Sequence, residues 1–135
     1  MSASTLFPRA RALVAVLAAS VLATAGVLVG GATTSGADAA KLRTWERLAN
    51  CESGQRWHIN TGNGYFGGLQ FSDSTWDAYS WGSMKERADR ASKKAQILTA
   101  EAVLDAQGWN AWPSCSDKIG LGKKEAKGKP YDGKH

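Results

Sequence analysis

The spacing of apolar residues predicts a helix that ends close to an acidic side chain. Between positions 42 and 51 the apolar residues recur at intervals of three or four, which places them on one helical face. These residues are Leu42, Trp45, and Leu48 or Ala49. Gly54 can adopt a positive φ without steric cost, so we expect the helix to end there. Glu52 would then lie in the last helical turn.

A second and longer helix is predicted for residues 93–107. Ser92 precedes it as a capping residue, and Gly108 follows its last turn. Its apolar face is formed by Ile97, Ala100 and Leu104, and is extended by Gln107. We expect Glu101, beside the same face, to be a partly exposed helix acid rather than a second catalytic group.

The segment between these helices contains too much glycine to be helical throughout. An Asn63-Gly64 turn signal lies between short apolar runs, which predicts a small irregular hairpin within residues 57–71. Ser72 then suits the N-cap of a short helix that ends near Tyr79. We expect residues 81–91 to be irregular.

The two ends of the chain differ from its middle in composition. Residues 1–39 have two arginines, an apolar run over 12–31 and an Ala37-Asp38-Ala39 pattern, which predicts a cleaved secretory signal. An uncleaved membrane anchor is the alternative, because the run approaches the ~20 residues that span a bilayer. Residues 117–135 are rich in lysine and poor in apolar side chains, so we expect a disordered basic tail. One folded domain, 41–116, would lie between them.

Positive charge is concentrated outside the predicted domain. Of the formal net charge of +5, the segment from Asp117 onward contributes +3, whereas Leu42 to Ser116 is neutral. A basic tail on a secreted protein suits an anionic envelope. A basic tail would also suit binding to nucleic acid. The sequence has no groove-reading motif, however, and we expect no nucleic-acid partner.

Two cysteines, Cys51 and Cys115, enclose nearly the whole predicted domain. In a secreted chain they are expected to form a disulfide. Over such a span the bond contributes ~4 kcal/mol in the loop-entropy estimate. Two free thiols or a metal pair are the alternatives. Two cysteines and His58 fall far short of a zinc-site spacing, so we expect no metal and no cofactor.

Glu52 is the candidate centre of the chemistry. A carboxylate in the last turn of a helix faces the negative end of the helix dipole, which favours its neutral form. Glycines and aromatic residues follow it, and glycine lets a loop or a ligand approach the backbone closely. The simplest alternative is a solvated acid at a helix end. We expect the neighbouring Arg56 to point to solvent.

Several spaced motifs resemble the resuscitation-promoting factors of actinobacteria. They are the run CESG, Trp57, the run NTGNGYFGGLQF, Thr75 with Trp76, and the run QGWNAWPSC. The resemblance covers about residues 42–115. Members of this family are secreted peptidoglycan-cleaving proteins with a lysozyme-like core. The implied fold class is α+β and mostly helical: a small lysozyme-like domain with a short irregular β-hairpin and one disulfide.

The resemblance also implies roles for individual residues. Glu52 would be the catalytic acid. The substrate-binding residues near it would be Tyr65, Gln70, Thr75 and Gln107. To these we add Trp57 and Asn63 from the glycine-rich loop. Aromatic rings there suit stacking on sugar rings, and the amide and hydroxyl groups suit N-acetyl and hydroxyl groups of a glycan.

Glycoside cleavage usually takes two carboxylates, and the motifs supply only Glu52. Asp73 and Asp77 share a helix face but are explained as a first-turn acid and a surface residue. The resemblance implies either of two reactions at the MurNAc-GlcNAc β-1,4 bond. In a lytic transglycosylase Glu52 protonates the glycosidic oxygen and the sugar's C6 hydroxyl closes a 1,6-anhydro ring. In a muramidase water attacks instead, and the sequence leaves both reactions open.

Two functions without catalysis are the alternatives: a peptidoglycan-binding lectin, and a cationic factor that acts on membranes or a receptor. The latter needs a basic amphipathic helix, and residues 93–107 have no basic residue after Lys94. The role that the resemblance implies is cell-wall remodelling that promotes growth of dormant cells. We expect a secreted or wall-associated monomer that binds glycan strands, with other cell-wall hydrolases as candidate partners. No stable membrane insertion is expected after signal cleavage.

Overall fold

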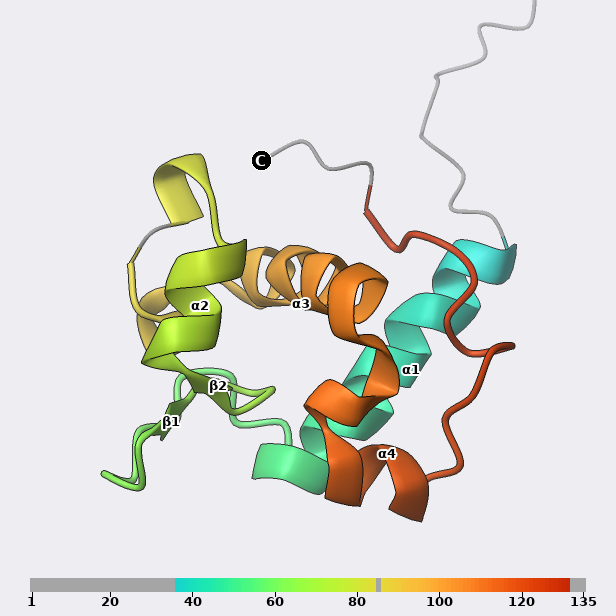
Figure 1. The fold of residues 1–135 in the computed structure, drawn as a ribbon, viewed down its shortest axis with the longest axis horizontal. Helices are drawn as coiled ribbons and strands as arrows, with labels where there is room; N and C mark the ends of the chain where they lie inside the picture. Colours follow the sequence, from blue (N-terminus) through green and yellow to red (C-terminus); the bar gives the residue numbers. More distant parts are fainter. Residues whose placement is uncertain (1–35, 85, 132–135) are drawn as a thin grey trace, which may run out of the picture. The chain divides into compact units, whose positions relative to one another are not determined.

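The computed structural model describes residues 36–84 and 86–131, which are mostly helical (Figure 1). The helices are α1 (Gly36–Ser53), α2 (Asp73–Tyr79), α3 (Lys93–Gln107) and α4 (Pro113–Lys118). The antiparallel strands β1 (Tyr65–Phe66) and β2 (Phe71–Ser72) form a hairpin. Short 3₁₀ turns connect these elements: η1 (Gly82–Met84), η2 (Ala88–Arg90) and η3 (Gly108–Ala111). The predicted fold class is confirmed.

The predicted secretory signal lies outside the described residues over positions 1–35, and so does the end of the predicted tail, 132–135. Residues 36–39 of the predicted signal belong to the first turn of α1. The division of the chain at residues 39 and 116 therefore stays a prediction. Among the described helices, none combines the length and the apolar character needed to cross a bilayer.

Local capping signals place α2 and α3 as predicted. The Ser72 hydroxyl accepts a hydrogen bond from the backbone N–H of Thr75 at 3.2 Å. The Ser92 hydroxyl does the same for the N–H of Ala95 at 3.1 Å. Such bonds satisfy N–H groups that have no partner within the helix. Gly108 follows α3 with a φ of +68°, in agreement with the predicted end.

α1 begins at Gly36, earlier than the predicted start at residue 42. Its first turn contains Asp38, whose charge complements the positive end of the helix dipole. Gly54 follows the last residue of the helix with a φ of +67°, as predicted. The N–H of Gly54 donates to the carbonyl oxygen of Asn50 at 3.0 Å. The chain therefore turns away directly after the turn that contains Glu52.

The hairpin turns at a different place from the predicted one. β1 and β2 pair across residues 67–70, whereas the sequence predicted the turn at Asn63-Gly64. That earlier turn closes only an isolated bridge from Asn60 to β1. The observed turn has a hydrogen bond from the N–H of Gln70 to the carbonyl oxygen of Gly67 at 3.2 Å. Both of these residues have positive φ, and Gln70 gives no sequence signal for such a conformation.

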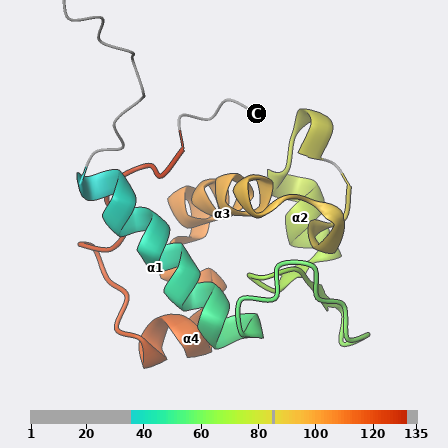
Figure 2. The same cartoon turned by 180° about the vertical axis from the view of Figure 1, so that it is seen from behind.

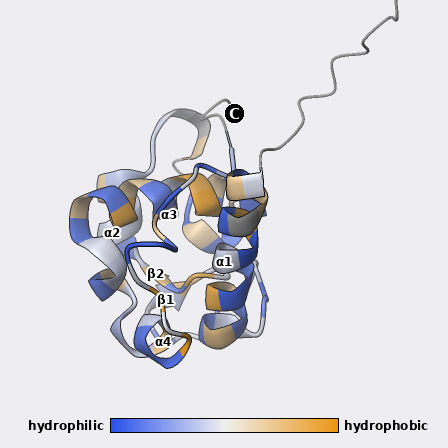
Figure 3. Cartoon of the chain, turned by 90° about the vertical axis from the view of Figure 1, so that its right-hand side faces the viewer, coloured by the Kyte–Doolittle hydropathy of each residue, from blue (hydrophilic) through white to orange (hydrophobic). Residues whose placement is uncertain are grey.

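Tryptophan rings lie at the centre of the core. Trp45 of α1 is fully buried, and its ring centroid lies 5.2 Å from that of Trp109 and 5.3 Å from that of Trp112. Phe71 of β2 contacts Trp76 of α2 at a centroid separation of 5.1 Å. Figure 3 shows both hydrophobic and hydrophilic residues along α1 and α3, as expected of helices that bury one face.

The predicted disulfide between Cys51 and Cys115 is confirmed and joins the end of α1 to α4. These two helices lie side by side in Figures 1 and 2. The bond closes a loop with a sequence separation of 64. Because Cys51 directly precedes Glu52, it also holds the backbone beside that carboxylate.

Residues 117–131 differ from the predicted disordered tail. They run beside α1, from α4 back to the first turn of α1 (Figures 1 and 2). The indole N–H of Trp109 donates to the carbonyl oxygen of Gly122 at 3.0 Å, and the guanidinium of Arg47 donates to that of Ile119 at 2.9 Å. Apolar side chains of the segment also pack against the core: Ile119, Leu121 and Tyr131. Amino-acid composition does not predict this packing, because the hydrogen-bond acceptors are main-chain carbonyl oxygens of the segment and not its side chains.

A buried ion pair connects this segment to α1 and α3. Lys41 is 1% exposed, and its ammonium lies 3.5 Å from a carboxylate oxygen of Glu101 and donates to the carbonyl oxygen of Ala126 at 2.8 Å. Glu101 also accepts a hydrogen bond from the Trp45 indole and lies 3.4 Å from the ammonium of Lys129. Glu101 is therefore buried and not partly exposed as predicted, because its charge has partners there. Burial lowers the pKa of Lys41, and Glu101 opposes that effect.

Candidate active site

Glu52 lies in the last turn of α1 between two residues that are held in place. On one side Cys51 is bonded to Cys115. On the other side the Ser53 hydroxyl is buried and donates to the carbonyl oxygen of Gly68 at 2.8 Å. Glu52 itself is partly exposed. A partly exposed carboxylate on a fixed backbone can meet a ligand from solvent.

Partial burial raises the pKa of Glu52 above the ordinary glutamate value, and loss of solvation is the cause. Among the described residues, no hydrogen bond or ion pair to its carboxylate offsets that effect. Arg56 is exposed, as predicted, and its side chain donates to the carbonyl oxygen of Ser53 at 2.7 Å. That contact places a cation at the C-terminal end of α1 without pairing it to Glu52. The carboxyl group is thus biased toward its protonated form.

A narrow cleft of about 70 Å³ lies between the hairpin, α2 and the end of α3. Four of the predicted substrate-binding residues line it: Tyr65, Gln70, Thr75 and Gln107. They come from β1, the hairpin turn, α2 and α3. The structure therefore brings together in one cleft residues that lie up to 42 positions apart in the sequence. Asn63 adjoins the cleft, since its amide donates to the side-chain oxygen of Gln70 at 3.3 Å.

The polar groups of the cleft are oriented by short contacts. The Ser72 hydroxyl donates to that of Thr75 at 3.0 Å, and the Gln107 amide donates to the Tyr79 hydroxyl at 3.1 Å. Tyr65 is 50% exposed. An exposed aromatic ring beside amide and hydroxyl groups suits a sugar, which presents an apolar face and polar edges.

Glu52 does not itself line this cleft, but a short path of hydrogen bonds connects the two. Ser53 binds Gly68, which lies two positions before Gln70. The next carbonyl oxygen, that of Leu69, accepts a hydrogen bond from the Trp112 indole at 2.9 Å. The loop that presents Gln70 is therefore tied both to the helix end of Glu52 and to the cleft wall.

Trp57 is not among the residues that line the cleft. Its ring packs against the loop, because a Cβ added at Gly68 would lie 2.5 Å from it. The ammonium of Lys93 lies 5.3 Å from the ring centroid on a cation–π contact. The structure gives Trp57 a packing role, and its predicted sugar stacking stays a prediction.

Sequence reasoning missed several residues of the cleft. The additional residues that line it are Phe71, Ser72, Val103, Ala111 and Trp112. Trp112 had a signal, because it belongs to the QGWNAWPSC run and an indole N–H needs a partner when buried. Val103 had no such signal in the sequence, since an apolar residue on a helix is expected to belong to the hydrophobic core.

Gln70 has a φ of +54°, which is uncommon for a residue other than glycine. We predict that Gln70→Gly melts within a few degrees of the wild type but binds soluble glycan fragments more weakly. Relief of backbone strain, about 1 kcal/mol, offsets loss of the side-chain hydrogen bond to the carbonyl oxygen of Gly67. Calorimetry of unfolding and of binding measures both effects. Gln70→Ala is the control, because it removes the amide but keeps the strain; undiminished binding in both variants would contradict the role of Gln70.

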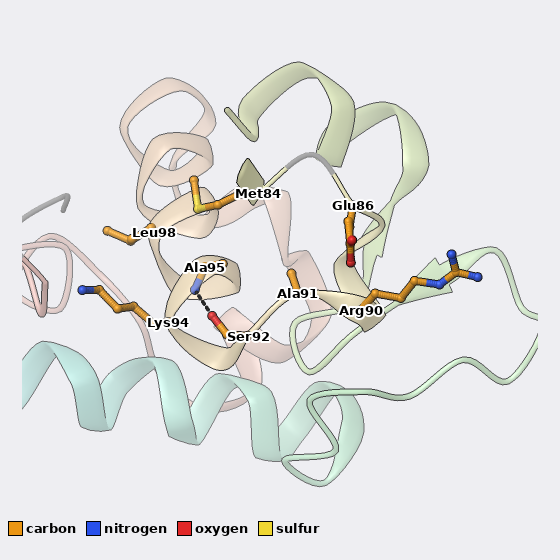
Figure 4. A pocket seen from close by; sticks show the side chains of 8 residues that line it. All are labelled: Met84, Glu86, Arg90, Ala91, Ser92, Lys94, Ala95 and Leu98. Carbon is orange, nitrogen blue, oxygen red and sulfur yellow. Dashed lines mark hydrogen bonds between the residues drawn. The ribbon is translucent and has the colours of Figure 1, made fainter. Parts of the chain in front are cut away.

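Several hollows of the described surface are larger than this cleft and contain neither Glu52 nor the residues that line the cleft. One of about 350 Å³ lies beside the first half of α3 and the preceding turns (Figure 4). Its lining residues are Met84, Glu86, Arg90, Ala91, Ser92, Lys94, Ala95 and Leu98. Within the described residues, no group of three or more His, Cys, Asp or Glu side chains is arranged to hold a metal ion.

Comparison with known proteins gives consistent matches. A family model described as "Transglycosylase-like domain" matches residues 39–115. A resuscitation-promoting factor of Corynebacterium glutamicum is 50% identical over 103 residues, which are 74% of this chain and 53% of that protein. One of Micrococcus luteus is 47% identical over 106 residues, 76% of this chain and 46% of that protein. RpfA of Mycobacterium tuberculosis is 48% identical over 99 residues, 72% of this chain and 24% of that protein. The chain thus spans about half the length, or less, of these curated relatives.

Proposed function

The chain belongs to the transglycosylase-like domain family, and from that premise we propose that it is a secreted enzyme that cleaves the glycan strands of peptidoglycan. Its role would be cell-wall remodelling that promotes resuscitation, the activity for which its relatives are named. The observation that carries the proposal is Glu52, a partly buried carboxyl group with a raised pKa at the end of a fixed helix. A neighbouring cleft offers amide, hydroxyl and aromatic groups to a sugar.

Glu52 acts first as a general acid in this proposal. Its proton moves to the glycosidic oxygen between MurNAc and GlcNAc, the C1–O bond breaks, and the carboxylate remains beside an oxocarbenium-like sugar. The carboxylate then accepts the proton of the sugar's C6 hydroxyl while that oxygen bonds to C1. The product is a 1,6-anhydro sugar, and Glu52 regains its proton. No second carboxylate is needed for this sequence of steps.

Hydrolysis is the alternative outcome at the same residue. Water would attack C1 in place of the C6 hydroxyl, with Glu52 accepting a proton from water. Asp73 and Asp77 are both exposed on α2, and neither lines the cleft. Their positions favour the single-carboxylate reaction over a two-carboxylate one. Mass analysis of fragments released from purified peptidoglycan tests the proposal, because the anhydro product is lighter than the hydrolytic product by one water. Absence of any released glycan fragment would refute both reactions.

Cleavage is predicted to be fastest at mildly acidic pH. Glu52 must be protonated to begin the reaction, so raising the pH through its folded-state pKa removes the active form and lowers the rate. Because burial raises that pKa, the alkaline limb should lie above the pKa of free glutamate. A pH–rate profile measured beside an NMR titration of the Glu52 carboxyl carbon checks the assignment. A pKa at or below that of free glutamate, with activity still rising through neutral pH, would exclude Glu52 as the proton donor.

A further inference from the structure

Gln96 of α3 has a completely buried side chain with specific hydrogen bonds to two loops. Its side-chain oxygen accepts from the backbone N–H of Gly68 at 2.8 Å. Its side-chain nitrogen donates to the carbonyl oxygens of Trp57 at 2.7 Å and Ala91 at 3.1 Å. Buried amides are expected to have such partners. Two of these three contacts, those to Trp57 and Gly68, lie on the loop between Glu52 and the cleft.

That loop fits against Gln96 and Trp57 without spare room. A Cβ added at Gly68 would lie 2.5 Å from the Trp57 ring, and one added at Gly67 would lie 2.4 Å from the side-chain oxygen of Gln96. Real Cβ atoms do not approach other atoms so closely. Gly67 therefore lets the loop backbone rest on the buried amide of Gln96, and Gly68 lets it rest on the Trp57 ring.

The backbone of Gly68 is also held by the residue next to Glu52. The carbonyl oxygen of Gly68 accepts from the Ser53 hydroxyl at 2.8 Å, while its N–H donates to Gln96. Two positions later, Gln70 presents its side chain to the cleft. Gln96 on α3 and Ser53 on α1 thus hold the segment between the acid and a substrate-binding amide.

We propose that Gln96 is a positioning residue, which sets the distance between Glu52 and the cleft through the peptide of Gly68. This inference rests on the proposed glycan cleavage. A proton donor must lie within hydrogen-bond reach of the glycosidic oxygen, and a misplacement of about 1 Å costs roughly 10²-fold in rate. Gln96 does not touch the sugar, so it acts through the loop.

The test compares two variants of Gln96 in the full chain on soluble glycan strands. Gln96→Met keeps the length of the side chain and removes all three hydrogen bonds. Its kcat is expected to fall about 10- to 100-fold with a smaller change in KM, because Tyr65, Thr75 and Gln107 still bind the sugar. Near-ultraviolet circular dichroism of the tryptophans confirms that each variant is folded at the assay temperature.

Gln96→Glu adds a readout that loss of stability alone would not produce. A protonated glutamate can accept from the N–H of Gly68 and donate to the carbonyl oxygen of Trp57, whereas the ionised form has no donor. The kcat of this variant relative to the wild type is therefore expected to approach one at acidic pH and to fall as pH rises. Dividing the kcat of the variant by that of the wild type at each pH cancels the effect of Glu52 titration, because both proteins contain Glu52. The ratio for Gln96→Met should not vary with pH.

Leu98→Ala serves as the matched control. Leu98 is a buried residue of the same helix that lines the hollow of Figure 4 and not the cleft. Its truncation should lower the melting temperature while kcat stays within about twofold of the wild type. A folded Gln96→Met with wild-type kcat, or a Gln96→Glu ratio that does not change with pH, would overturn the inference and leave the proposed function standing. A wild-type protein that does not cleave glycan strands would overturn the proposed function and this inference with it.

Discussion

Glu52→Gln is expected to reduce peptidoglycan cleavage by at least about 10²-fold, the usual contribution of a general acid. Glutamine keeps the size of the side chain but has no proton that can move to the glycosidic oxygen. The fold should persist, because the disulfide of Cys51 and the Ser53 hydroxyl bond to Gly68 hold this part of α1 independently of the carboxylate. The rate of release of soluble glycan fragments from purified peptidoglycan measures the effect.

The same variant has an expected stability signature. The folded-state pKa of Glu52 is raised by burial, so its stabilising contribution is fully present below the unfolded-state pKa and is lost as pH rises through the folded-state pKa. Glutamine stays neutral throughout. Glu52→Gln should therefore melt above the wild type at neutral pH, and the difference should vanish on acidification. A variant that melts lower at neutral pH would contradict the assigned cost of charging Glu52.

Glu52→Gln also separates the enzyme from a peptidoglycan-binding lectin. A lectin would use the cleft residues without needing the carboxyl proton, so binding to purified sacculi should survive in the variant. Full cleavage activity in Glu52→Gln would contradict the proposed mechanism. Retained binding without cleavage in the variant, beside an active wild type, is the expected result.

Deleting residues 119–135 is expected to lower the melting temperature substantially. The buried ammonium of Lys41 would lose the carbonyl oxygen of Ala126, and the Trp109 indole would lose that of Gly122. A hydrogen bond contributes about 0.5–1.5 kcal/mol between neutral groups and about 1.5–3 kcal/mol where one group is charged, as in Lys41. For a domain of this size each kcal/mol lowers the melting temperature by about 4–8 °C. A fall of at least about 8 °C follows from the two hydrogen bonds together, and differential scanning calorimetry measures it.

Lys129→Gln is the control for this deletion. Lys129 lies 2.9 Å from Asp105 and 3.4 Å from Glu101, but its side chain is 57% exposed. Exposed ion pairs contribute about 0–1 kcal/mol, so this variant should melt close to the wild type. If the deletion also left the melting temperature unchanged, residues 119–131 would not pack on the domain, and the disordered tail expected from composition would be the better description.

Elements with local signals could be predicted from the sequence, and those that depend on distant partners could not. Ser92 and Gly108 are read directly as helix caps, and α3 has the predicted bounds. The packing of residues 117–131 depends on main-chain acceptors for Trp109 and Lys41, which no composition reveals. The burial of Glu101 follows from the same distant partners.

The candidate site likewise contains residues that the sequence predicted and residues that only the structure shows. The substrate-binding set came from the resemblance, and the structure brings four of its members into one cleft. The place of Trp57 in a glycine-rich loop predicts sugar stacking, and the structure shows its ring packed against that loop. Gln96 was missed because a glutamine in a helix usually faces solvent. Only the three-dimensional arrangement shows that its amide is buried beneath Gly68.

The two ends of the described chain meet in space. The backbone N–H of Lys129 donates to the Asp38 carboxylate at 3.0 Å, and a Cβ at Gly128 would lie 2.9 Å from the carbonyl oxygen of Ala37. The first turn of α1 is therefore a neighbour of the last described residues. Domains with adjacent termini tolerate circular permutation and insertion into a host protein. The domain could accordingly be displayed from a loop of a carrier, with a short linker at each end and the cleft left free.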